Sequence, residues 1–225
     1  ERNVQPNVGV YCSLIYACAL TVEEDPTAAD RCTELLHLMK KDGILPNTVT
    51  YTAAMKVYSL AGRKEEVFRL FQQMKARRLR RDLSVYHTLF SSLSGDAKDV
   101  VRCSGLYKNM RRDRVRPNLY TFNVIMRVCA AAKDLEHAWS FLNEMGRLNV
   151  QPTSVTFNTI LQCCIKTDAD SGASTSDLNY QSVLERMHAQ HVARNAGTYN
   201  LLINLSMQDK DREQGLRFFE EMKAA

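Results

Sequence analysis

The sequence has no long apolar run: no stretch approaches the roughly 18 apolar residues that a membrane-spanning helix requires. Glycine and proline are scarce, with nine and five residues in a chain of 225, while 45% of the residues are hydrophobic and 24% are charged. This composition excludes a collagen-like chain and a largely disordered one. We therefore expect a folded, soluble protein that has no membrane partner.

Cysteine pairs of the C-x-x-C type are also missing. The seven cysteines form an odd set, namely Cys12, Cys18, Cys32, Cys103, Cys129, Cys163 and Cys164. Such a set argues against a disulfide framework or a structural zinc site and favours a reducing compartment. Three of them share one position of a repeated helix and are expected in the core: Cys18, Cys129 and Cys164.

Known catalytic and metal-binding patterns are lacking as well. His188 and His191 are spaced i, i+3 without an HExxH pattern, and Asp168 and Asp170 miss the spacing of an EF-hand. The sequence contains no G-x-x-x-x-G-K-[ST] loop, no G-x-S-x-G elbow and no pair of catalytic carboxylates. It therefore predicts a protein that is not an enzyme, with no catalytic residue, metal, cofactor or small-molecule substrate.

What the sequence does contain is a repeat with a period near 35 residues. Aromatic residues recur at intervals of 40, 35, 36, 35 and 42, at Tyr11, Tyr51, Tyr86, Phe122, Phe157 and Tyr199. Methionines recur at intervals of 35, 36, 35, 42 and 35, at Met39, Met74, Met110, Met145, Met187 and Met222. Two independent markers that share one period indicate tandem repeats.

Each period contains two amphipathic helices. The first has apolar residues at i, i+3, i+4 and i+7, as in Phe122, Ile125, Met126 and Cys129. The second repeats this spacing and ends on the methionine, down to the last copy at Gly215, Phe218, Phe219 and Met222. A helical pair this short buries its apolar face by stacking on its neighbours. The predicted fold class is all-α, a right-handed superhelical solenoid of helix-turn-helix repeats.

Turn residues agree with these helices. Gly62 and Gly95 lie where a first helix should stop in a left-handed cap. Asp25–Pro26 is typical of an N-cap followed by the first helical residue, and each proline near the end of a period is expected to break the second helix. The small polar segment 167–177 is expected to form a surface loop between two helices.

The repeat resembles the pentatricopeptide repeat (PPR). The resemblance lies in the motifs V-T-Y-x, A-G-R, L-F-x-x-M and a closing x-P-N/D, and the best copy is TVTYTAAMKVYSLAGRKEEVFRLFQQMKARRLRRD at 48–82. Tetratricopeptide repeats differ, because they prefer 34 residues and a glycine at the eighth position of the first helix. Here that position holds Ile15, Met55, Phe90, Met126, Leu161 and Ile203.

The resemblance covers about residues 8–225. It divides the chain into the tail of a preceding repeat at 1–7 and PPR repeats at 8–47, 48–82, 83–118, 119–153, 154–195 and 196–225. The fifth of these repeats has an insertion between its helices near 167–177, and the last is incomplete.

The resemblance implies an organellar protein that binds single-stranded RNA in a concave groove at one base per repeat. In this family the fifth and the last residue of a repeat contact the base edge. The corresponding pairs are Cys12/Asn47, Thr52/Asp82, His87/Asn118, Asn123/Thr153 and Asn158/Asn195, with Asn200 lacking its partner. The family's code assigns guanine to Thr52/Asp82 and a pyrimidine to Asn158/Asn195, while Cys12 and His87 depart from it. Asn, Asp and Thr at repeat ends are equally typical of helix N-caps and turns.

Other groove positions fit the family less well. Apolar residues at the second position, which sandwich the base, are present as Val49, Tyr120 and Val155 but replaced by Gly9, Ser84 and Gly197. The basic groove residue at the thirteenth position is present as Lys166, and its counterparts are Leu20, Leu60, Gly95, Ala131 and Gln208. Phosphate contacts supply much of the affinity for RNA, so the groove is poorly equipped for them.

Positive charge collects instead at the ends of two second helices. The chain has 30 Lys and Arg against 25 Asp and Glu, and its net charge of +5 permits an anionic partner. The concentrated residues are Lys75, Arg77, Arg78, Arg80, Arg81, Arg111, Arg112, Arg114 and Arg116. Two interpretations of these nine residues are open. Cations stabilise a helix C-terminus, and the same residues could form a ridge that contacts the phosphates of structured RNA.

Three functions follow. The first is an organellar RNA-binding PPR protein that acts in RNA processing, stability or translation without catalysis of its own. The second is a scaffold subunit of a large ribonucleoprotein such as the mitochondrial ribosome, in contact with structured rRNA and other proteins. The third is the RNA-targeting half of a processing enzyme whose catalytic domain lies outside this chain. The resemblance implies a mitochondrial location, with the chloroplast as the alternative.

Overall fold

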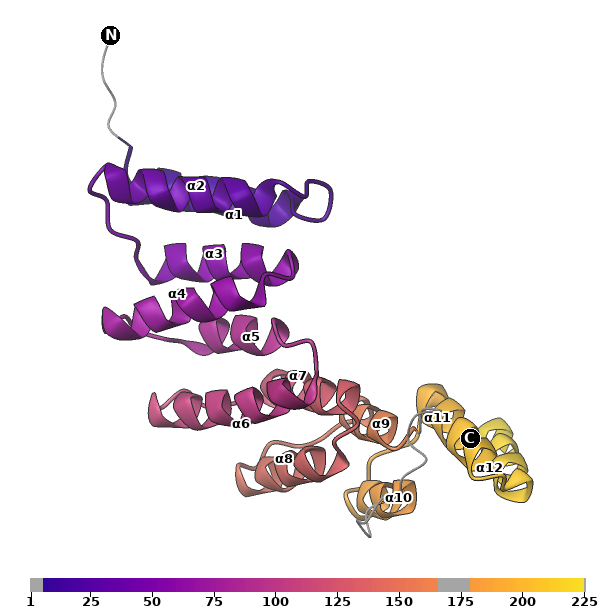
Figure 1. The fold of residues 1–225 in the computed structure, drawn as a ribbon. Helices are drawn as coiled ribbons and strands as arrows, with labels where there is room; N and C mark the ends of the chain where they lie inside the picture. Colours follow the sequence, from indigo (N-terminus) through magenta and orange to yellow (C-terminus); the bar gives the residue numbers. More distant parts are fainter. Residues whose placement is uncertain (1–5, 166–178, 225) are drawn as a thin grey trace. The chain divides into compact units, whose positions relative to one another are not determined.

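The computed structural model describes residues 6–165 and 179–224, which are helical throughout apart from turns and connections (Figure 1). The expected loop at 167–177 and Lys166 lie outside this part of the chain. The helices of the described residues are α1 (Val8–Thr21), α2 (Ala28–Lys41), α3 (Thr48–Leu60), α4 (Lys64–Ala76), α5 (Leu83–Ser91), α6 (Ala97–Arg112), α7 (Leu119–Ala131), α8 (Leu135–Arg147), α9 (Ser154–Cys163), α10 (Tyr180–Ala189), α11 (Ala196–Gln208) and α12 (Arg212–Ala224). Not one of them combines the length and the hydropathy needed to cross a bilayer.

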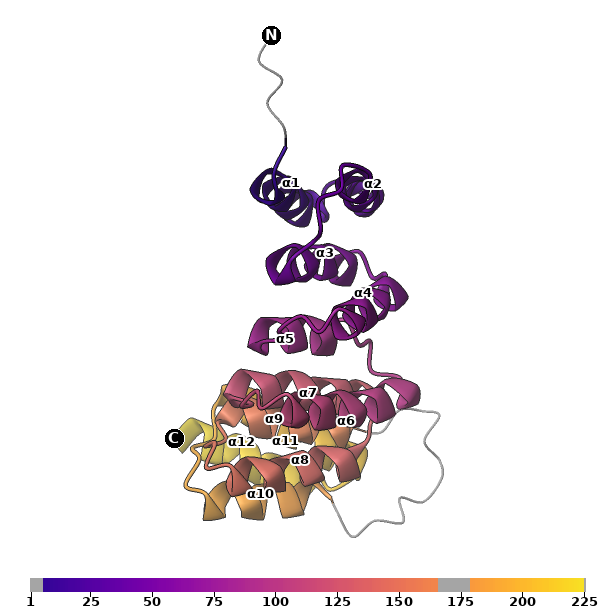
Figure 2. The ribbon, with the colours of Figure 1, turned by 90° about the vertical axis from the view of Figure 1, so that its left-hand side faces the viewer.

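The chain divides into two compact units. The first contains the residues up to Leu93 together with Leu106–Arg116, and the second contains Ser94–Gly105 and the residues from Pro117 onward. In the first unit, α3 packs between α1 and α5, while α2 packs on α1 and α4 on α3. Figure 2 shows α1, α3 and α5 in one column and α2 and α4 in a second. In the second unit, α9 packs between α7 and α11, and α8, α10 and α12 each pack on the odd-numbered helix before them.

Each odd-numbered helix begins at a polar N-cap residue with an extended backbone. Asn47 Oδ1 accepts a hydrogen bond from the Thr50 N–H at 2.9 Å, which satisfies one of the amides left unpaired at a helix start. The same bond from the residue three positions on recurs at Asn7, Asp82, Asn118 and Asn195. The last residues of the expected repeats are therefore N-caps, as their residue types permit.

The even-numbered helices α2, α4, α6, α8 and α10 end in a left-handed residue two positions beyond the last helical one. Their φ angles are 72° at Gly43, 53° at Arg78, 58° at Arg114, 53° at Asn149 and 54° at His191. The amide that follows returns to the helix, as where Leu79 N–H donates to the Met74 carbonyl at 3.0 Å, which is the Schellman pattern.

Two expectations about helix boundaries are therefore wrong. Proline does not end the second helices, because α4 and α10 end in the same way with no proline following and the other prolines come three residues after the left-handed position. The N-cap of α2 is Thr27 rather than Asp25. Asp25 Oδ1 instead accepts hydrogen bonds from the Thr27 N–H at 2.8 Å and hydroxyl at 2.6 Å, which holds the preceding turn. The left-handed cap at Gly62 is confirmed, with a φ angle of 71°. Gly95 also has a positive φ, 90°, but it lies four residues beyond the end of α5, whose C-cap is Ser92.

The predicted apolar stripes form the core. The four stripe residues of α7 have no exposed surface, and the methionines from Met39 to Met187 are all buried. Phe219 departs from the pattern with 41% exposure, because α12 packs on α11 and no later helix of the described chain covers its other side. Cys18 and Cys129 are buried as expected, whereas Cys164 is half-buried because it follows the last residue of α9.

Tyrosines of the aromatic series reach the end of the following even-numbered helix. Tyr11 OH donates to Asp42 Oδ2 at 2.5 Å, and Tyr86 OH donates to Asp113, whereas Tyr51 OH accepts from Arg77 Nη1 at 3.3 Å. Where the aromatic is Phe122 or Phe157, the C-cap residue of the even-numbered helix is Leu148 or Gln190. In the first unit the hydroxyl is thus present where the helix end offers a charged partner.

Candidate nucleic-acid interface

The first turns of the odd-numbered helices carry exposed apolar side chains beside polar caps. Val49 is 63% exposed, Tyr120 54% and Val155 57%, although the rest of each helix is largely buried. The expected exceptions, Gly9, Ser84 and Gly197, are exposed but offer no apolar surface. At Gly197 a Cβ would lie 3.2 Å from Asn158 Nδ2 and from Asn195 Oδ1, so neighbouring amides restrict side chains there.

In the second unit, buried threonines connect the fifth and last residues of the expected repeats. Thr156 Oγ1 donates to Asn123 Oδ1 at 2.8 Å and lies 3.4 Å from Thr153 Oγ1. Thr198 Oγ1 donates to Asn158 Oδ1 at 2.7 Å and accepts from the Asn195 N–H at 3.2 Å. Both threonines have no exposed surface. Within each candidate pair of this unit, Asn123/Thr153 and Asn158/Asn195, the two residues are therefore connected by a threonine in the first turn of the next odd-numbered helix.

The hydrogen bonds around Thr198 fix how the amides of Asn158 and Asn195 are turned. Asn195 Oδ1 accepts from the Thr198 N–H at 2.9 Å and from Asn158 Nδ2 at 3.2 Å, while Asn158 Oδ1 accepts from the Thr198 hydroxyl. The carbonyl oxygens thus face the helix start. An amide nitrogen has two donors, so each Asn retains an N–H that the bonds to Asn195 Oδ1 and Ser154 Oγ do not use. The Asn158/Asn195 pair therefore offers amide N–H donors to a ligand.

The first unit shows one connected pair and one that is not connected. Thr50 Oγ1 lies 3.1 Å from Cys12 Sγ and donates to Asn47 Oδ1 at 3.0 Å. At Thr52/Asp82 the corresponding position is the buried Val85, so no hydroxyl bridges the pair. Thr52 Oγ1 donates instead to its own helix at the Thr48 carbonyl, 2.8 Å away.

The remaining base-reading candidates are placed separately. His87 is half-buried on α5 of the first unit, and Asn118 caps α7 of the second. Asn200 is exposed on α11. The bridging threonines were not identified from the sequence, although the middle T of V-T-Y, Y-T-F, V-T-F and G-T-Y, which is the third residue of each expected repeat, was a usable signal.

The thirteenth positions that the structure describes offer no cation. Leu20 is 67% exposed and Leu60 47%, and both lie at the end of their helix. Gly95 has a φ of 90°, and a Cβ there would lie 2.3 Å from Ala131 Cβ, so a lysine has no room. Ala131 and Gln208 end α7 and α11 with exposed side chains.

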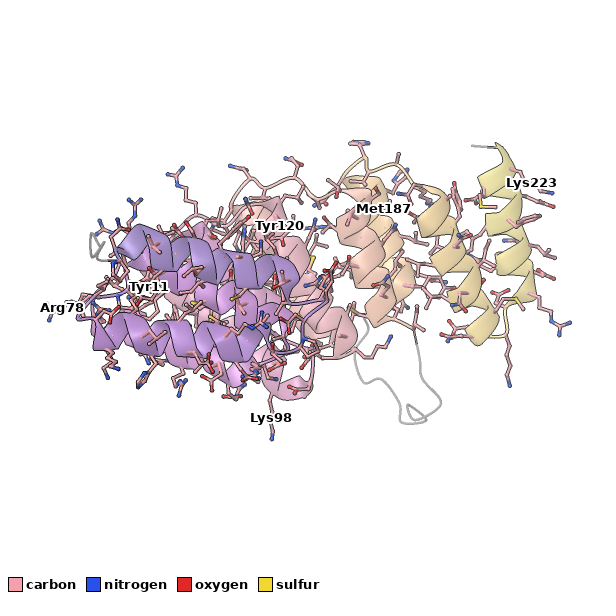
Figure 3. The ribbon with its side chains drawn as sticks, turned by 90° about the horizontal axis from the view of Figure 1, so that it is seen from above. Tyr11, Arg78, Lys98, Tyr120, Met187 and Lys223 are labelled. Carbon is pink, nitrogen blue, oxygen red and sulfur yellow. The ribbon has the colours of Figure 1, made fainter. Side chains whose placement is uncertain are left out.

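The basic residues at the two helix ends belong to the first unit and are called the basic ridge from here on: Lys75, Arg77, Arg78, Arg80, Arg81, Arg111, Arg112, Arg114 and Arg116. They lie at and beyond the C-terminal ends of α4 and α6, which Figure 1 draws on the same side. Arg78 and Arg114 occupy the two left-handed positions and are exposed. Figure 3 shows Arg78 at the outer edge of this unit.

One ion pair joins the two helix ends. Arg81 Nε and Nη2 donate to Asp113 at 2.6 and 2.7 Å, and Tyr86 OH donates to the same carboxylate. The side chains of Arg81 and Asp113 are 19% and 13% exposed. The hydrogen bonds from Arg81 hold the pKa of Asp113 below its usual range, and burial together with the bond to Asp113 raises the pKa of Tyr86. The carboxylate therefore stays ionised and anchors Arg81.

A surface cleft of about 540 Å³ lies over this ion pair. Its lining includes the side chains of Arg78, Arg80 and Arg114 and the cap residue Asp82. Within the described chain, Arg81 is the one ridge residue paired with a carboxylate. Arg77 is held apart from the cleft by hydrogen bonds to the Pro46 carbonyl and Tyr51 OH.

Across residues 6–165 and 179–224, no three His, Cys, Asp or Glu side chains gather in a way that could hold a metal ion. Burial raises the pKa of the thiol to about 12 at Cys32 and Cys129. A protonated thiol is a poor nucleophile and a poor metal ligand.

Stacked odd-numbered helices with a partner helix on each define an α-helical tandem-repeat protein. A family model described as a pentatricopeptide repeat domain matches residues 1–61, 34–96, 69–131, 105–167 and 182–225. The chain belongs to the pentatricopeptide repeat family, whose members bind RNA.

Curated relatives include two plant proteins. A chloroplastic pentatricopeptide repeat-containing protein of Arabidopsis thaliana is 32% identical over 131 residues, which is 57% of this chain and 24% of the relative. A chloroplastic PPR5 homologue of Oryza sativa subsp. japonica is 28% identical over 109 residues, 46% of this chain and 22% of the relative. The chain thus spans about a quarter of the length of these relatives.

Solved structures confirm the all-α solenoid. PPR10 from maize has a TM-score of 0.72 at 20% identity and covers 99% of this chain, which spans 30% of PPR10. PPR10 in complex with an 18-nt psaJ RNA element has a TM-score of 0.70 at 19% identity, with 98% and 34% covered. The PPR domain of Arabidopsis thaliana protein-only RNase P 1, in complex with tRNA, has a TM-score of 0.59 at 22% identity, with 76% and 86% covered.

Proposed function

We propose that this chain binds single-stranded RNA along the first turns of its odd-numbered helices and does no chemistry on it. The observation that carries this proposal is an exposed apolar residue beside a polar pair at the starts of α3, α7 and α9, as at Val155 with Asn158 and Asn195. An exposed apolar side chain can pack on a base, which contributes about 1–3 kcal/mol per stacked base. The polar pair then lies beside the base edge.

The chemistry of two pairs suggests different bases. Asn158 and Asn195 present N–H donors, which suit the O2 carbonyl that both pyrimidines share. Asp82 presents a carboxylate with one oxygen occupied by the Val85 N–H, and a carboxylate accepts well from the N1–H and N2–H donors of guanine. These assignments agree with those that the family's code implies.

The relatives support an organellar role in RNA processing, stability or translation. Two of the matched plant proteins are named chloroplastic, and PPR10 was crystallised with an RNA element. We propose an organellar location, with the mitochondrion first and the chloroplast as the alternative. The expected repeat boundaries between residues 8 and 225 belong to the same proposal.

The second candidate function is that of a scaffold subunit in a ribonucleoprotein such as the mitochondrial ribosome. The described thirteenth positions carry no cation, while cations accumulate on the ridge of the first unit. This distribution favours contact with structured rRNA, together with protein partners. A role as the targeting half of a processing enzyme is supported by the protein-only RNase P 1 neighbour.

The test is selection of enriched sequences from randomised single-stranded RNA, with the chain and with Asp82→Asn. Asn caps the equivalent helices at positions 47 and 118, so this substitution keeps the helix start and replaces an acceptor with a donor. We expect one guanine of the enriched motif to lose its preference while the other positions stay unchanged. The matched control is Asp134→Asn, which alters the N-cap of α8. An Asp82→Asn motif identical to that of the unmodified chain would refute base reading by this pair.

A further inference from the structure

The basic ridge is separate in chemistry from the helix starts that carry the proposed base-reading pairs. Between residues 75 and 81 the chain has five basic residues and no acidic one. The following even-numbered helix adds four basic residues between 111 and 116 against Asp113. Asp113 forms hydrogen bonds with Arg81 and Tyr86, and Asp82 also lines the cleft, so two carboxylates lie among nine basic residues and the surface keeps an excess of positive charge.

The geometry points to a binding surface for the phosphates of double-stranded RNA, formed by Arg78, Arg80 and Arg114 around the cleft over the Arg81–Asp113 pair. This inference rests on the proposed RNA-binding function and assigns a second class of RNA to the ridge, whose cleft adjoins the Thr52/Asp82 pair at Asp82. Arg78 and Arg114 are exposed in left-handed turns at the ends of α4 and α6. Guanidinium groups bind phosphate oxygens through paired donors, which makes arginine well suited to this ligand.

The ion pair under the cleft sets the spacing of these arginines. Arg81 reaches from the segment after α4 to the segment after α6, with donor–acceptor distances of 2.6 and 2.7 Å. The pair fixes two helix ends whose exposed arginines would otherwise move apart by repulsion. Because the two helix ends are already held together in the free protein, less conformational entropy is lost when the arginines bind a ligand.

The scarcity of exposed apolar side chains on the basic ridge favours double-stranded over single-stranded RNA as its ligand. Among the described residues, no large apolar side chain between 61 and 100 or between 102 and 119 is exposed, and Leu79, Leu83 and Val115 in the cleft lining are half-buried. Single strands are held by stacking on aromatic or apolar side chains, whereas RNA duplexes are recognised through phosphates and 2′-hydroxyls. The ridge offers the second kind of contact. A protein interface favours an apolar centre, and no exposed large apolar side chain of the described chain lines this cleft.

The test is binding of the chain to a blunt 20-base-pair RNA duplex of unrelated sequence between 50 and 200 mM salt. The variant is Arg78→Gln with Arg80→Gln and Arg114→Gln, which leaves the Arg81–Asp113 pair in place. The control carries the same charge change away from the ridge, with Lys210→Gln, Arg212→Gln and Arg217→Gln. Lys210 is exposed in a left-handed turn like Arg78, so the control also matches backbone conformation.

We expect the ridge variant to lose duplex affinity and the control to retain it. Three phosphate contacts contribute about 0.9 each to the slope of log affinity against log salt, so the fourfold rise in salt should weaken the unmodified chain about 40-fold more than the ridge variant. Equal affinities and slopes for the ridge variant and the control would overturn the inference. So would a loss confined to single-stranded RNA, or binding of poly-glutamate tighter than that of the duplex, which would assign the ridge to an acidic protein. The Asp82→Asn selection uses single strands, so its failure can be told from failure here.

Discussion

The Arg81–Asp113 ion pair should contribute measurably to the stability of the first unit. Asp113→Asn keeps the shape of the side chain and removes the charge that accepts two hydrogen bonds at 2.6 and 2.7 Å. Hydrogen bonds to charged groups contribute about 1.5–3 kcal/mol each, while exposed ion pairs contribute about 0–1 kcal/mol in total. The side chains of Arg81 and Asp113 are 19% and 13% exposed, so the pair lies between a buried charged hydrogen bond and an exposed ion pair. We therefore expect Asp113→Asn to lower the free energy of unfolding by about 2–3 kcal/mol.

A double-mutant cycle with Arg81→Met isolates the pair from other effects of either substitution. The assay is urea denaturation at pH 7 followed by far-UV circular dichroism, with Asp113→Asn, Arg81→Met and the double variant compared. We expect a coupling energy of about 2 kcal/mol. A coupling energy below about 0.5 kcal/mol would refute the reasoning, since the pair would then behave as a solvent-exposed one.

The same pair predicts a pH dependence. Arg81 lowers the pKa of Asp113 in the folded state, so the stabilisation is fully present above the unfolded-state pKa of about 3.9. It is lost as the pH falls through the lower, folded-state value. The difference in stability between the unmodified chain and Asp113→Asn should therefore be constant from pH 7 to about 5 and shrink below about pH 4. A difference as large at pH 2 as at pH 7 would contradict this account.

Three further predictions concern the caps and the core. Thr198→Val should cost about 1 kcal/mol of stability in urea denaturation and loosen the pyrimidine preference, because the Asn158 amide loses the hydroxyl that orients it. Arg78→Gly should stabilise the chain by about 0.5–1 kcal/mol, seen as a higher Tm, because glycine adopts the left-handed conformation without steric cost. Cys32 and Cys129 should react with an aromatic disulfide reagent at pH 8 only on unfolding, because burial raises the pKa of each thiol to about 12.

Each of these has an outcome that contradicts it. Val85 occupies the position of Thr198 in α5, so valine fits this site, and an unchanged stability would mean that the hydrogen bonds contribute nothing. A lower Tm for Arg78→Gly would mean that the arginine side chain stabilises the turn more than its backbone conformation costs. Rapid thiol reaction in the native protein at the buried positions would show that the core opens locally.

The core could be predicted from the sequence because it depends on periodicity. Phe122, Ile125 and Met126 share a helical face whatever the neighbours are, and all three are fully buried. Phe219 obeys the same spacing but is exposed, because burial also requires a next helix that packs over it. Periodicity states which residues share a face and leaves open what covers that face.

Helix ends were less predictable because a left-handed cap needs a conformation and not a residue type. Glycine marks that conformation at Gly43 and Gly62, but Arg78, Arg114 and His191 adopt it as well. No composition rule separates these three from other basic residues near a helix end. The Schellman hydrogen bonds that end the helix are made by the backbone, and they leave no trace in the side chains.

The candidate site also has a part that the sequence predicted and a part that it did not. The N-cap role of the repeat-end residues followed from their types, and the structure shows it for Asn47, Asp82 and Asn118. The bridge through Thr198 could not be derived from helical periodicity, because it joins side chains 40 positions apart in adjacent helices. Contacts between repeats depend on how helices stack, which spacing within one repeat does not specify.

The pairing of tyrosine with charged helix ends has a consequence for how such an array can change. Tyr86 OH donates to Asp113, whereas in the next period the aromatic is Phe122 and the C-cap of the even-numbered helix is Leu148. A recombination that joined the Tyr86 helix to the Leu148 helix would bury a hydroxyl with no acceptor, at a cost of about 1–3 kcal/mol. Exchange of a whole helix pair would carry both partners along. Duplication and transplantation within this chain should therefore proceed in units of two helices, with crossovers in the segment just before an N-cap.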